Sequence, residues 1–393
     1  MLLEGVSVVE WSEDLTSQFA ARLLADMGAT VVKLEPPGGS ALRRRGPHWP
    51  DGHGALFDFL NSGKICREID PSAASGAEVL RQAIASADVL VEFGLDAAFA
   101  TASVTVDELR RSRPELVVLS ITPLGLDADP ATAPSSDFLL QHRAGLAHAM
   151  ARPVRDPTAQ PPLAAADHEA PLAVGVCGAL AAAWGLLAAR SGRGPRIDLA
   201  SQDFYVLLLT DEYTQWHGGE RHFSRARGDR PGVAPAGGIS WLLPARDGHF
   251  MVSPREQHQW ERWLDVLGRP AWAQDPAYAT VATRKSHWRE LLDLMSAWSA
   301  DQAAEDVAAR AQAAGVACFP VSTPSQLLSN AQLLHRDFFD RLTGRDGTAI
   351  PVPGLPVRIA NTVGEQLARR RILHPPAIDA TATPSRSPSN VRA

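Results

Sequence analysis

The sequence predicts an α/β protein, with a Rossmann-like parallel sheet in a large domain and a second, smaller α+β domain. The first observation is a βαβ pattern near the start of the chain. Residues 6–11 and 30–34 are β-branched apolar runs, and apolar side chains between them recur at helical spacing up to Gly28. The second observation is that the alternation continues, with helix patterns at 77–87 and 106–114 and strand patterns at 88–93 and 116–121. Such alternation favours parallel strands covered by helices.

Changes of composition indicate where the domains begin and end. We expect residues 1–213 to form the N-terminal part of the large domain. Residues 214–237 are rich in Gly, Arg and His and predict a linker, whereas 238–330 concentrates tryptophan and predicts the smaller α+β domain. Residues 331–373 contain a Pro-rich extended stretch, and 374–393 has the composition of a disordered tail.

Composition and charge exclude several classes of partner. The 393 residues carry a net charge of -6, with 38 basic and 44 acidic side chains mixed along the chain, so no broad basic face is available for nucleic acid. Cys66, Cys177 and Cys318 have no CxxC spacing, which predicts neither a disulfide framework nor a metal site and fits a reducing cytoplasm. Residues 171–189 approach the length of a membrane span, but their Ala and Gly content favours a buried core helix and no membrane partner.

The turn after the first strand does not have the chemistry of a dinucleotide site. A dinucleotide fingerprint needs glycines there, so that the backbone can approach the pyrophosphate. Here residues 12–17 read Ser-Glu-Asp-Leu-Thr-Ser, although Glu35 stands where such a fold would place its ribose-binding acid. Two carboxylates at the start of a helix would repel a diphosphate. We therefore expect this loop to bind a ligand other than NAD or flavin, or to have no binding role.

Three arginines follow the second strand of the βαβ pattern. Arg43, Arg44 and Arg45 come directly after a Gly-Gly turn, where arginines at the carboxyl edge of a parallel sheet can pair bidentately with phosphates. A solvated basic loop is the other interpretation of the same pattern.

A cluster of titratable residues precedes the long apolar helix. Asp167, His168 and Glu169 stand just ahead of it, and Pro171 falls in its first turn. A carboxylate at this position is kept ionised by the helix dipole, which suits a nucleophile. Two other interpretations remain open: Asp167 or Glu169 caps the helix, or Asp167 and His168 together transfer a proton.

Taken together, these segments resemble the class III CoA-transferases, the family of formyl-CoA transferase, carnitine CoA-transferase and α-methylacyl-CoA racemase. The resemblance covers nearly the whole chain. The matching segments are LLADMGATVVKLEPPGG (23–39), FLNSGKICREID (59–70), ADVLVEF (87–93), SSDFLLQHRAGL (135–146), SGRGPRIDLASQD (191–203), DGHFMV (247–252) and AAGVACFPV (313–321).

The resemblance implies an interlocked dimer, in which the C-terminal segment returns to the large domain. It also implies that CoA is bound as a substrate, with no permanently bound cofactor, and that the partners are an acyl-CoA and a small carboxylic acid. By the resemblance, the residues beside the acyl group are Ser12, Thr16, Ser17 and Gln18, the residues that meet the CoA phosphates are Arg43 and Arg44, and the other candidates for binding CoA or substrate are Lys33, Asn61, Lys64 and Asp137.

The family transfers CoA through an aspartate, which forms a mixed anhydride and then an aspartyl thioester. Alignment on the helix segment CGALAAAW places Asp167 or His168 at this position, and Asp167 is our candidate nucleophile. Counting back from the SGRG segment reaches Ala170 or Pro171 instead, which cannot do this chemistry. The glycine-rich turn that commonly follows the aspartate in the family is replaced here by His-Glu-Ala-Pro.

Three functions follow from the resemblance. The first is a CoA-transferase that uses Asp167. The second is an acyl-CoA racemase, which is disfavoured because Ser136 stands where the racemase branch has a histidine. The third is a catalytically silent subunit that pairs with an active relative, as in the heteromeric benzylsuccinate CoA-transferases. The third is favoured by two departures from the family motifs, EFGLD at 92–96 and SITPLG at 120–125.

Overall fold

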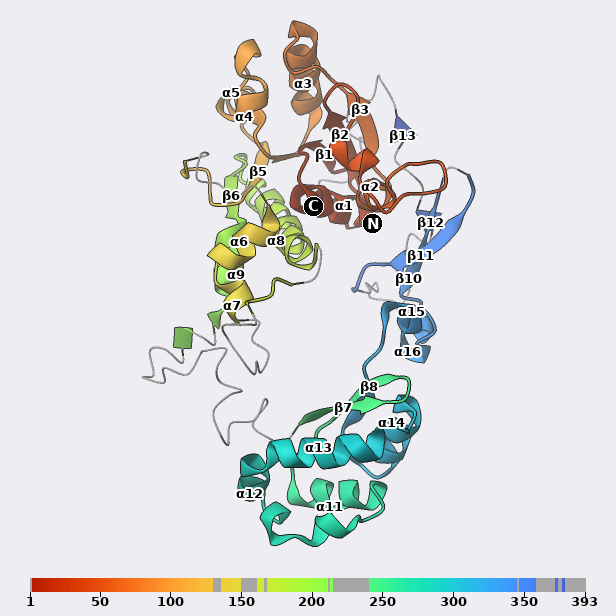
Figure 1. Cartoon of the computed structure of the whole chain (residues 1–393). Coiled ribbons are helices and arrows are strands. Elements are labelled where there is room, and N and C mark those ends of the chain that lie inside the picture. The colour runs from red at the N-terminus through yellow and green to blue at the C-terminus, as the bar shows by residue number, and fades with distance from the viewer. Residues whose placement is uncertain are drawn as a thin grey trace. The chain divides into compact units, whose positions relative to one another are not determined.

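The computed structural model describes residues 2–129, 136–149, 161–165, 168–210, 213–214, 240–344, 346–357, 372–373 and 377–378 (Figure 1). The chain divides into two compact units. The first contains Met1–Leu146, Ala164–Leu208 and Ala331–Ala393, and the second contains Ala147–Leu163 and Leu209–Asn330. Nearly all of the predicted linker at 214–237 lies outside the described residues.

The first unit is built on a seven-stranded sheet in which every pair of neighbouring strands is parallel. This confirms the predicted Rossmann-like sheet. The strand order is β13-β3-β2-β1-β4-β5-β6, so successive strands are added on one side of β1 up to β3 and on the other side from β4 onward. The topological switch point, at which such folds bind their ligands, therefore lies between β1 and β4. The strands are β1 (Ser7–Trp11), β2 (Thr30–Glu35), β3 (Ile65–Glu68), β4 (Val89–Glu92), β5 (Val117–Thr122), β6 (Arg196–Ala200) and β13 (Ala377–Ile378).

Strand β13 lies within the stretch that we expected to be a disordered tail. Its two residues pair with Ile65 and Cys66 of β3 and extend the sheet at that edge. The composition of 374–393 gave no indication of a strand because two residues are too short to show a period-2 pattern.

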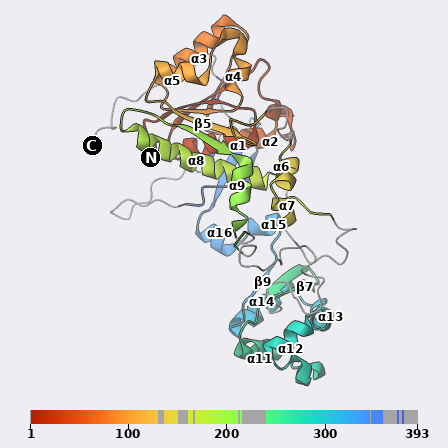
Figure 2. The ribbon, with the colours of Figure 1, turned by 90° about the vertical axis from the view of Figure 1, so that its left-hand side faces the viewer.

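Helices cover both faces of the sheet (Figure 2). On one face, α1 (Leu15–Asp26) and α8 (Glu169–Ala189) pack on alternate residues of the strands, and on the other face α3 (Ala74–Ser86) and α5 (Val106–Ser112) do the same. Among the described residues, the remaining helices of this unit are η1 (Ala41–Arg44), α2 (Ala55–Asn61), α4 (Leu95–Ala98), η2 (Ala100–Ala102), α6 (Asp137–Arg143), α9 (Ser201–Leu207) and α16 (Ala331–His335). Helix α7 (Leu146–Ala149) begins at the last residue of a first-unit segment, and its other residues belong to the second unit.

Helix α8 approaches its neighbours closely because it presents small residues to them. A Cβ on Gly175 would lie 2.9 Å from the backbone oxygen of Thr16, and a Cβ on Gly185 would lie 2.5 Å from Cγ1 of Val117. Among the described residues, α8 is the one helix long and apolar enough to cross a membrane by length and composition alone. Its glycine face packs on α1 and β5, as expected of a core helix, whereas Val176, Leu180, Trp184 and Leu187 are exposed, so the helix is buried on one side and not throughout.

A second, three-stranded sheet of the first unit has the order β11-β10-β12 and is formed by β10 (Phe339–Thr343), β11 (Ala349–Pro353) and β12 (Ile372–Leu373). Trp49 packs against Leu342 and Val352 of this sheet. The segment after residue 330 therefore packs on the N-terminal part of the chain.

The second unit is a small α+β fold with its own core, and this confirms the smaller domain that the sequence predicts. Its antiparallel sheet contains β7 (Trp241–Ala245), β8 (Gly248–Val252) and β9 (Cys318–Pro320). Trp260, Trp263 and Tyr278 are buried in its core. Its helices are α11 (Gln257–Val266), η6 (Ala271–Gln274), η7 (Pro276–Tyr278), α12 (Val281–Ser286), α13 (Trp288–Ser299), α14 (Ala304–Ala313) and α15 (Pro324–Leu327).

Candidate active site

The loop between β1 and α1 lies at the topological switch point of the sheet. Strand β1 ends at Trp11, and α1 begins at Leu15. Asp14 caps the helix, because its Oδ1 accepts a hydrogen bond of 2.8 Å from the backbone N–H of Ser17. The backbone N–H of Gln18 donates to the backbone oxygen of Asp14 at 3.4 Å, and the dipole of α1 makes this end of the helix favourable for negative charge. We call residues 12–18, which comprise this loop and the first turn of α1, the switch-point loop.

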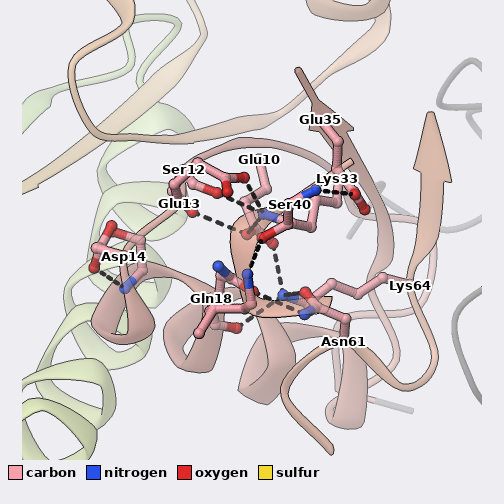
Figure 3. A network of polar contacts seen from close by, with 12 residues as sticks. Glu10, Ser12, Glu13, Asp14, Gln18, Lys33, Glu35, Ser40, Asn61 and Lys64 are labelled. Atoms are coloured by element: carbon pink, nitrogen blue, oxygen red, sulfur yellow. Dashed lines mark hydrogen bonds and ion pairs between the residues drawn. The ribbon is translucent and has the colours of Figure 1, made fainter. Parts of the chain in front are cut away.

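A buried charge cluster lies directly beneath this loop (Figure 3). Glu10 of β1 and Lys33 of β2 are register partners in the sheet, and Lys64 stands just before β3. Lys33 Nζ lies 2.9 Å from Glu10 Oε1, and Lys64 Nζ lies 2.6 Å from Glu10 Oε2, with none of the three side chains exposed. The cluster therefore contains one carboxylate and two ammonium groups in a dry environment.

The electrostatics of the buried cluster follow from this composition. Burial alone would raise the pKa of Glu10, but Lys33 and Lys64 outweigh burial and hold that pKa below its usual range. Burial would likewise lower the pKa of Lys33, but Glu10 and Glu13 raise it. For Lys64 burial prevails and lowers the pKa to about 8, although Glu10 opposes the change.

Both lysines also hold the backbone of the switch-point loop. Lys33 Nζ donates to the backbone oxygen of Ser12 at 2.5 Å, and Lys64 Nζ donates to that of Gln18 at 2.8 Å. Ser12 Oγ in turn donates to Glu10 Oε1 at 2.9 Å. The two ends of the loop are thus tied to one carboxylate, so the loop is fixed relative to the sheet.

Three buried side-chain atoms of the switch-point loop have no hydrogen-bond partner among the described residues: Asp14 Oδ2, Ser17 Oγ and Gln18 Nε2. Burial raises the pKa of Asp14, against the backbone hydrogen bond from Ser17 that lowers it. Thr16 and Ser17 are buried beside these residues in the first turn of α1. Buried polar groups in folded proteins are almost always paired, so unpaired ones at a switch point indicate the position of a ligand or an ordered water.

Glu35 is engaged within the protein rather than available for a ribose. Its two carboxylate oxygens accept 2.8 Å hydrogen bonds from Nε and Nη2 of Arg43, and Oε2 also accepts one from the backbone N–H of Ser40. Arg43 also lies over the ring of Phe57. Arg44 and Arg45 are exposed, so they are the arginines of this segment that solvent and ligands reach most easily.

Asp137 belongs to a second polar group, at the start of α6. Its carboxylate accepts hydrogen bonds from the hydroxyl of Tyr205 and, at 2.5 Å, from Nε2 of Gln141. Gln141 Oε1 accepts one of 2.8 Å from the backbone N–H of Ala165. The group therefore connects α6 and α9 to Ala165, which stands two residues before Asp167 in the sequence.

Asp167 lies outside the described residues. The next residue, His168, is at the N-cap position of α8 with a φ of +47°, in the left-handed region, and its side chain makes no capping hydrogen bond. Glu169, Ala170 and Pro171 form the first turn of α8. Further along α8, Gly175 packs on Thr16, so the N-terminal half of α8 lies beside the switch-point loop.

Ser136, which stands where the racemase branch has a histidine, has a structural role in this chain. Its Oγ caps α6 by accepting a hydrogen bond of 3.4 Å from the backbone N–H of Leu139. A serine hydroxyl does not ionise near neutral pH, so it cannot replace an imidazole as an acid or base.

The structure brings together five of the eleven residues that the sequence nominated. Ser12, Gln18, Lys33, Asn61 and Lys64 share one hydrogen-bonded network, whereas Asp137 and the Arg43–Glu35 pair belong to neighbouring groups. Direct contact of any of them with CoA or an acyl group stays a prediction.

Sequence reasoning missed Glu10, Gln141 and Tyr205. A signal for Glu10 was present, because a carboxylate in an otherwise apolar strand of a parallel sheet is buried on both faces and needs cationic partners. No comparable signal marked Gln141 or Tyr205, since their connection to the segment before Asp167 depends on tertiary packing.

The strand order defines a Rossmann-like fold, and the turn at its switch point contains no glycine. A family model, CoA-transferase family III, matches residues 3–371. The chain therefore belongs to CoA-transferase family III, a class III family of transferase enzymes.

Two curated relatives are similar over most of their length. The succinate–glutarate CoA-transferase of Agrobacterium fabrum is 27% identical over 92% of this chain and 90% of its own. The BbsE subunit of the succinyl-CoA:(R)-benzylsuccinate CoA-transferase of Thauera aromatica is 28% identical over 87% of this chain and 85% of its own.

Solved structures share the fold. A CAIB/BAIF family protein from Brucella suis superposes with a TM-score of 0.82 at 24% identity, with 96% of each chain covered. Rv3272 from Mycobacterium tuberculosis does so with a TM-score of 0.74 at 21% identity, over 96% of this chain and 97% of its own.

Proposed function

We propose that the chain transfers CoA from an acyl-CoA to a small carboxylic acid, with the reacting acyl group held at the switch-point loop. The observation that carries this proposal is the buried, unpaired Gln18 Nε2 at the switch point of a chain from CoA-transferase family III. A buried amide donor is costly unless an acceptor fills the position, and a thioester or carboxylate oxygen is such an acceptor. Ser12, Thr16 and Ser17 line the same loop.

The nucleophile in this proposal is the carboxylate of Asp167. It attacks the carbonyl carbon of the donor thioester, the C–S bond breaks, and CoA thiolate leaves a mixed anhydride. The thiolate then attacks the aspartyl carbonyl carbon, which releases the donor acid and forms an aspartyl thioester. The acceptor carboxylate attacks this thioester, which releases CoA thiolate and forms a second anhydride. The thiolate then attacks the carbonyl carbon of the acceptor acyl group, which forms the new acyl-CoA and restores the Asp167 carboxylate.

The start of α1 supports these steps electrostatically. Each attack places negative charge on a carbonyl oxygen, and the dipole of α1 favours negative charge at the N-terminus of this helix. The exposed Arg44 would meet the phosphates of CoA, for which a guanidinium fork is well suited, while Arg43 beside it offers only the N–H groups that Glu35 does not use.

The substrates proposed follow from the named relatives. The relatives described above use succinate, glutarate or benzylsuccinate with CoA or succinyl-CoA, according to their names. We therefore propose succinyl-CoA as the donor and a dicarboxylic acid as the acceptor, in the reducing cytoplasm that the separate free cysteines fit.

The test is to incubate the purified chain with succinyl-CoA and a panel of mono- and dicarboxylic acids, and to identify new CoA thioesters by mass spectrometry. We expect one acceptor group to yield its thioester, and calorimetry to show binding of CoA and not of NAD. Binding of NAD together with no response to CoA would contradict the proposal.

A second candidate is a catalytically silent subunit of a heteromeric CoA-transferase, and the similarity to BbsE, which is a named subunit, favours it. An apolar stripe on α8 also calls for a partner chain, either a second copy or a relative. Its members are Val176, Leu180, Trp184 and Leu187, each about half exposed. Light scattering should show a dimer that Trp184→Glu dissociates, and turnover only after co-purification with a related chain would establish the silent-subunit function.

A further inference from the structure

Lys64 and Asn61 are buried and fully engaged within the protein. Lys64 Nζ donates to three oxygens: Glu10 Oε2 at 2.6 Å, the backbone oxygen of Gln18 at 2.8 Å and Asn61 Oδ1 at 2.8 Å. These three acceptors use all three protons of an ammonium group. Lys64 therefore has no proton left to offer a ligand, and any effect it has on a ligand passes through the groups that it holds.

The contacts of Lys64 determine which way the Asn61 amide points. An ammonium group only donates hydrogen bonds, so the atom of Asn61 that faces Lys64 must be the oxygen. The nitrogen then faces the other way, and Nδ2 donates to Gln18 Oε1 at 2.8 Å and to the backbone oxygen of Phe57 at 3.0 Å. Figure 3 shows the contacts that join Lys64, Asn61 and Gln18.

The same reasoning determines the orientation of the Gln18 amide. Because Asn61 presents a donor, the atom of Gln18 that faces it must be the oxygen, and Nε2 lies on the other side of the amide. That nitrogen is buried and meets no acceptor among the described residues. Lys64 also fixes the main chain of Gln18 through its backbone oxygen, so both the position and the polarity of the amide are set.

We propose that Lys64 and Asn61 are positioning residues, which hold the Gln18 amide in the one orientation that offers Nε2–H to an oxygen of the acyl-CoA. This inference rests on the proposed function. It assigns neither residue a contact with the substrate; each acts through Gln18. Glu10 binds Lys64, Lys64 orients the Asn61 amide, and Asn61 orients the Gln18 amide, so that Gln18 Nε2 is left as the donor.

The variant Asn61→Asp tests the proposal without changing Gln18. A carboxylate at 61 accepts from Lys64 and also accepts from Gln18, so the Gln18 amide must turn and present its oxygen to the substrate. The variant balances two carboxylates against Lys33 and Lys64, and for this reason we expect it to fold. Turnover with succinyl-CoA should fall at least tenfold, because one donor to the developing charge is replaced by an acceptor.

Two further variants and one binding measurement separate positioning from structure. Gln18→Glu also presents an acceptor, so its loss of kcat should match that of Asn61→Asp, and Asn330→Asp on the exposed surface of the second unit should keep wild-type rates. The Tm of Asn61→Asp should stay within a few degrees of wild type. Calorimetry should show unchanged affinity for CoA, which has no acyl oxygen. A fall in Tm that accounts for the lost turnover, or wild-type turnover in Asn61→Asp, would overturn the proposal.

Side-chain amide NMR of protein labelled with ¹⁵N-glutamine separates this inference from the proposed function. We expect the Gln18 amide proton resonances, assigned through their absence in Gln18→Glu, to move downfield and exchange more slowly in Asn61→Asp because a carboxylate accepts from them. If this occurs but the wild type transfers no CoA, the positioning stands and the proposed function fails. If the wild type is active and the Gln18 resonances do not change, the positioning is wrong.

Discussion

Glu10 and Lys33 are register partners on the central strands β1 and β2, and Lys33 Nζ lies 2.9 Å from Glu10 Oε1 with neither side chain exposed. Lys64 occupies the other oxygen of the same carboxylate. One buried carboxylate therefore serves two ammonium groups. Because of this ratio, removing the carboxylate and removing a lysine have different consequences for the buried charge.

We expect Glu10→Gln to destabilise the protein far more than Lys64→Met. Without the carboxylate, Lys64 loses its ion-pair partner and Lys33 keeps only Glu13, at 3.9 Å, which costs about 3–5 kcal/mol or prevents folding. Lys64→Met leaves Glu10 and Lys33 as a matched pair and costs about 1–3 kcal/mol for the acceptors that lose their donor. Urea unfolding measures both changes, and a larger loss for Lys64→Met would contradict the charge assignment.

The contribution of Lys64 to stability should depend on pH. Its pKa is about 8 in the folded protein and ordinary, near 10.5, in the unfolded chain, so the unfolded state binds more protons between these values. Stability from this group therefore rises as pH increases from about 8 to about 10.5, and the cost of burying the charge is fully present below pH 8. The charged groups around it are Glu10 on β1 and Lys33 on β2, while the Cys66 thiol on β3 stays neutral because burial raises its pKa.

The measurement compares the unfolding free energy of wild type and Lys64→Met at pH 7 and pH 10. We expect wild type to gain on the order of 1–3 kcal/mol relative to the variant over this interval. A difference between the two proteins that is constant with pH would show that Lys64 titrates normally.

Gly185→Ala tests the close packing of α8 on the sheet. In an exposed helix interior this change is stabilising by about 1 kcal/mol. Here the new Cβ would lie 2.5 Å from Cγ1 of Val117, so we expect the opposite sign, a loss of about 1–3 kcal/mol. Cys177→Ala, on a half-buried face of the same helix, is the control and should change the unfolding free energy by less.

His168→Gly tests the backbone at the start of α8. His168 has a φ of +47°, where glycine is unstrained, so the change should raise the unfolding free energy by about 0.5–1 kcal/mol. Ser103, with a φ of 53°, offers a matched control, and Ser103→Gly should behave alike. If Asp167 is the nucleophile, His168→Gly keeps turnover; loss of turnover without loss of stability would place the chemistry on His168.

The sheet and the two compact folds were predictable because they depend on local patterns. The β-branched runs at 6–11 and 30–34 and the helical spacing between them determine a βαβ unit, and the tryptophans after 238 form a separate core. Strand β13 was not predictable, since a two-residue strand has no period and its partner β3 lies more than 300 residues away.

The candidate site was predictable only in part. The missing glycines predicted that the switch-point loop does not bind a dinucleotide, and the family resemblance nominated Gln18, Asn61 and Lys64. Their mutual arrangement was not predictable, because the network joins Glu10 to Lys64 across 54 residues and depends on the register of β1 with β2. The sequence showed which residues are polar, whereas the fold shows which of their atoms are already occupied.

The most direct test of CoA transfer is to trap the covalent intermediate. The protein is incubated with succinyl-CoA, treated with hydroxylamine or borohydride, digested and mapped by mass spectrometry, with Asp167→Asn in parallel. We expect modification of Asp167 alone in the wild type, and neither modification nor turnover in Asp167→Asn, which keeps CoA affinity because the amide preserves the shape of the side chain. Turnover with another carboxylate modified, or full activity of Asp167→Asn, would contradict the mechanism.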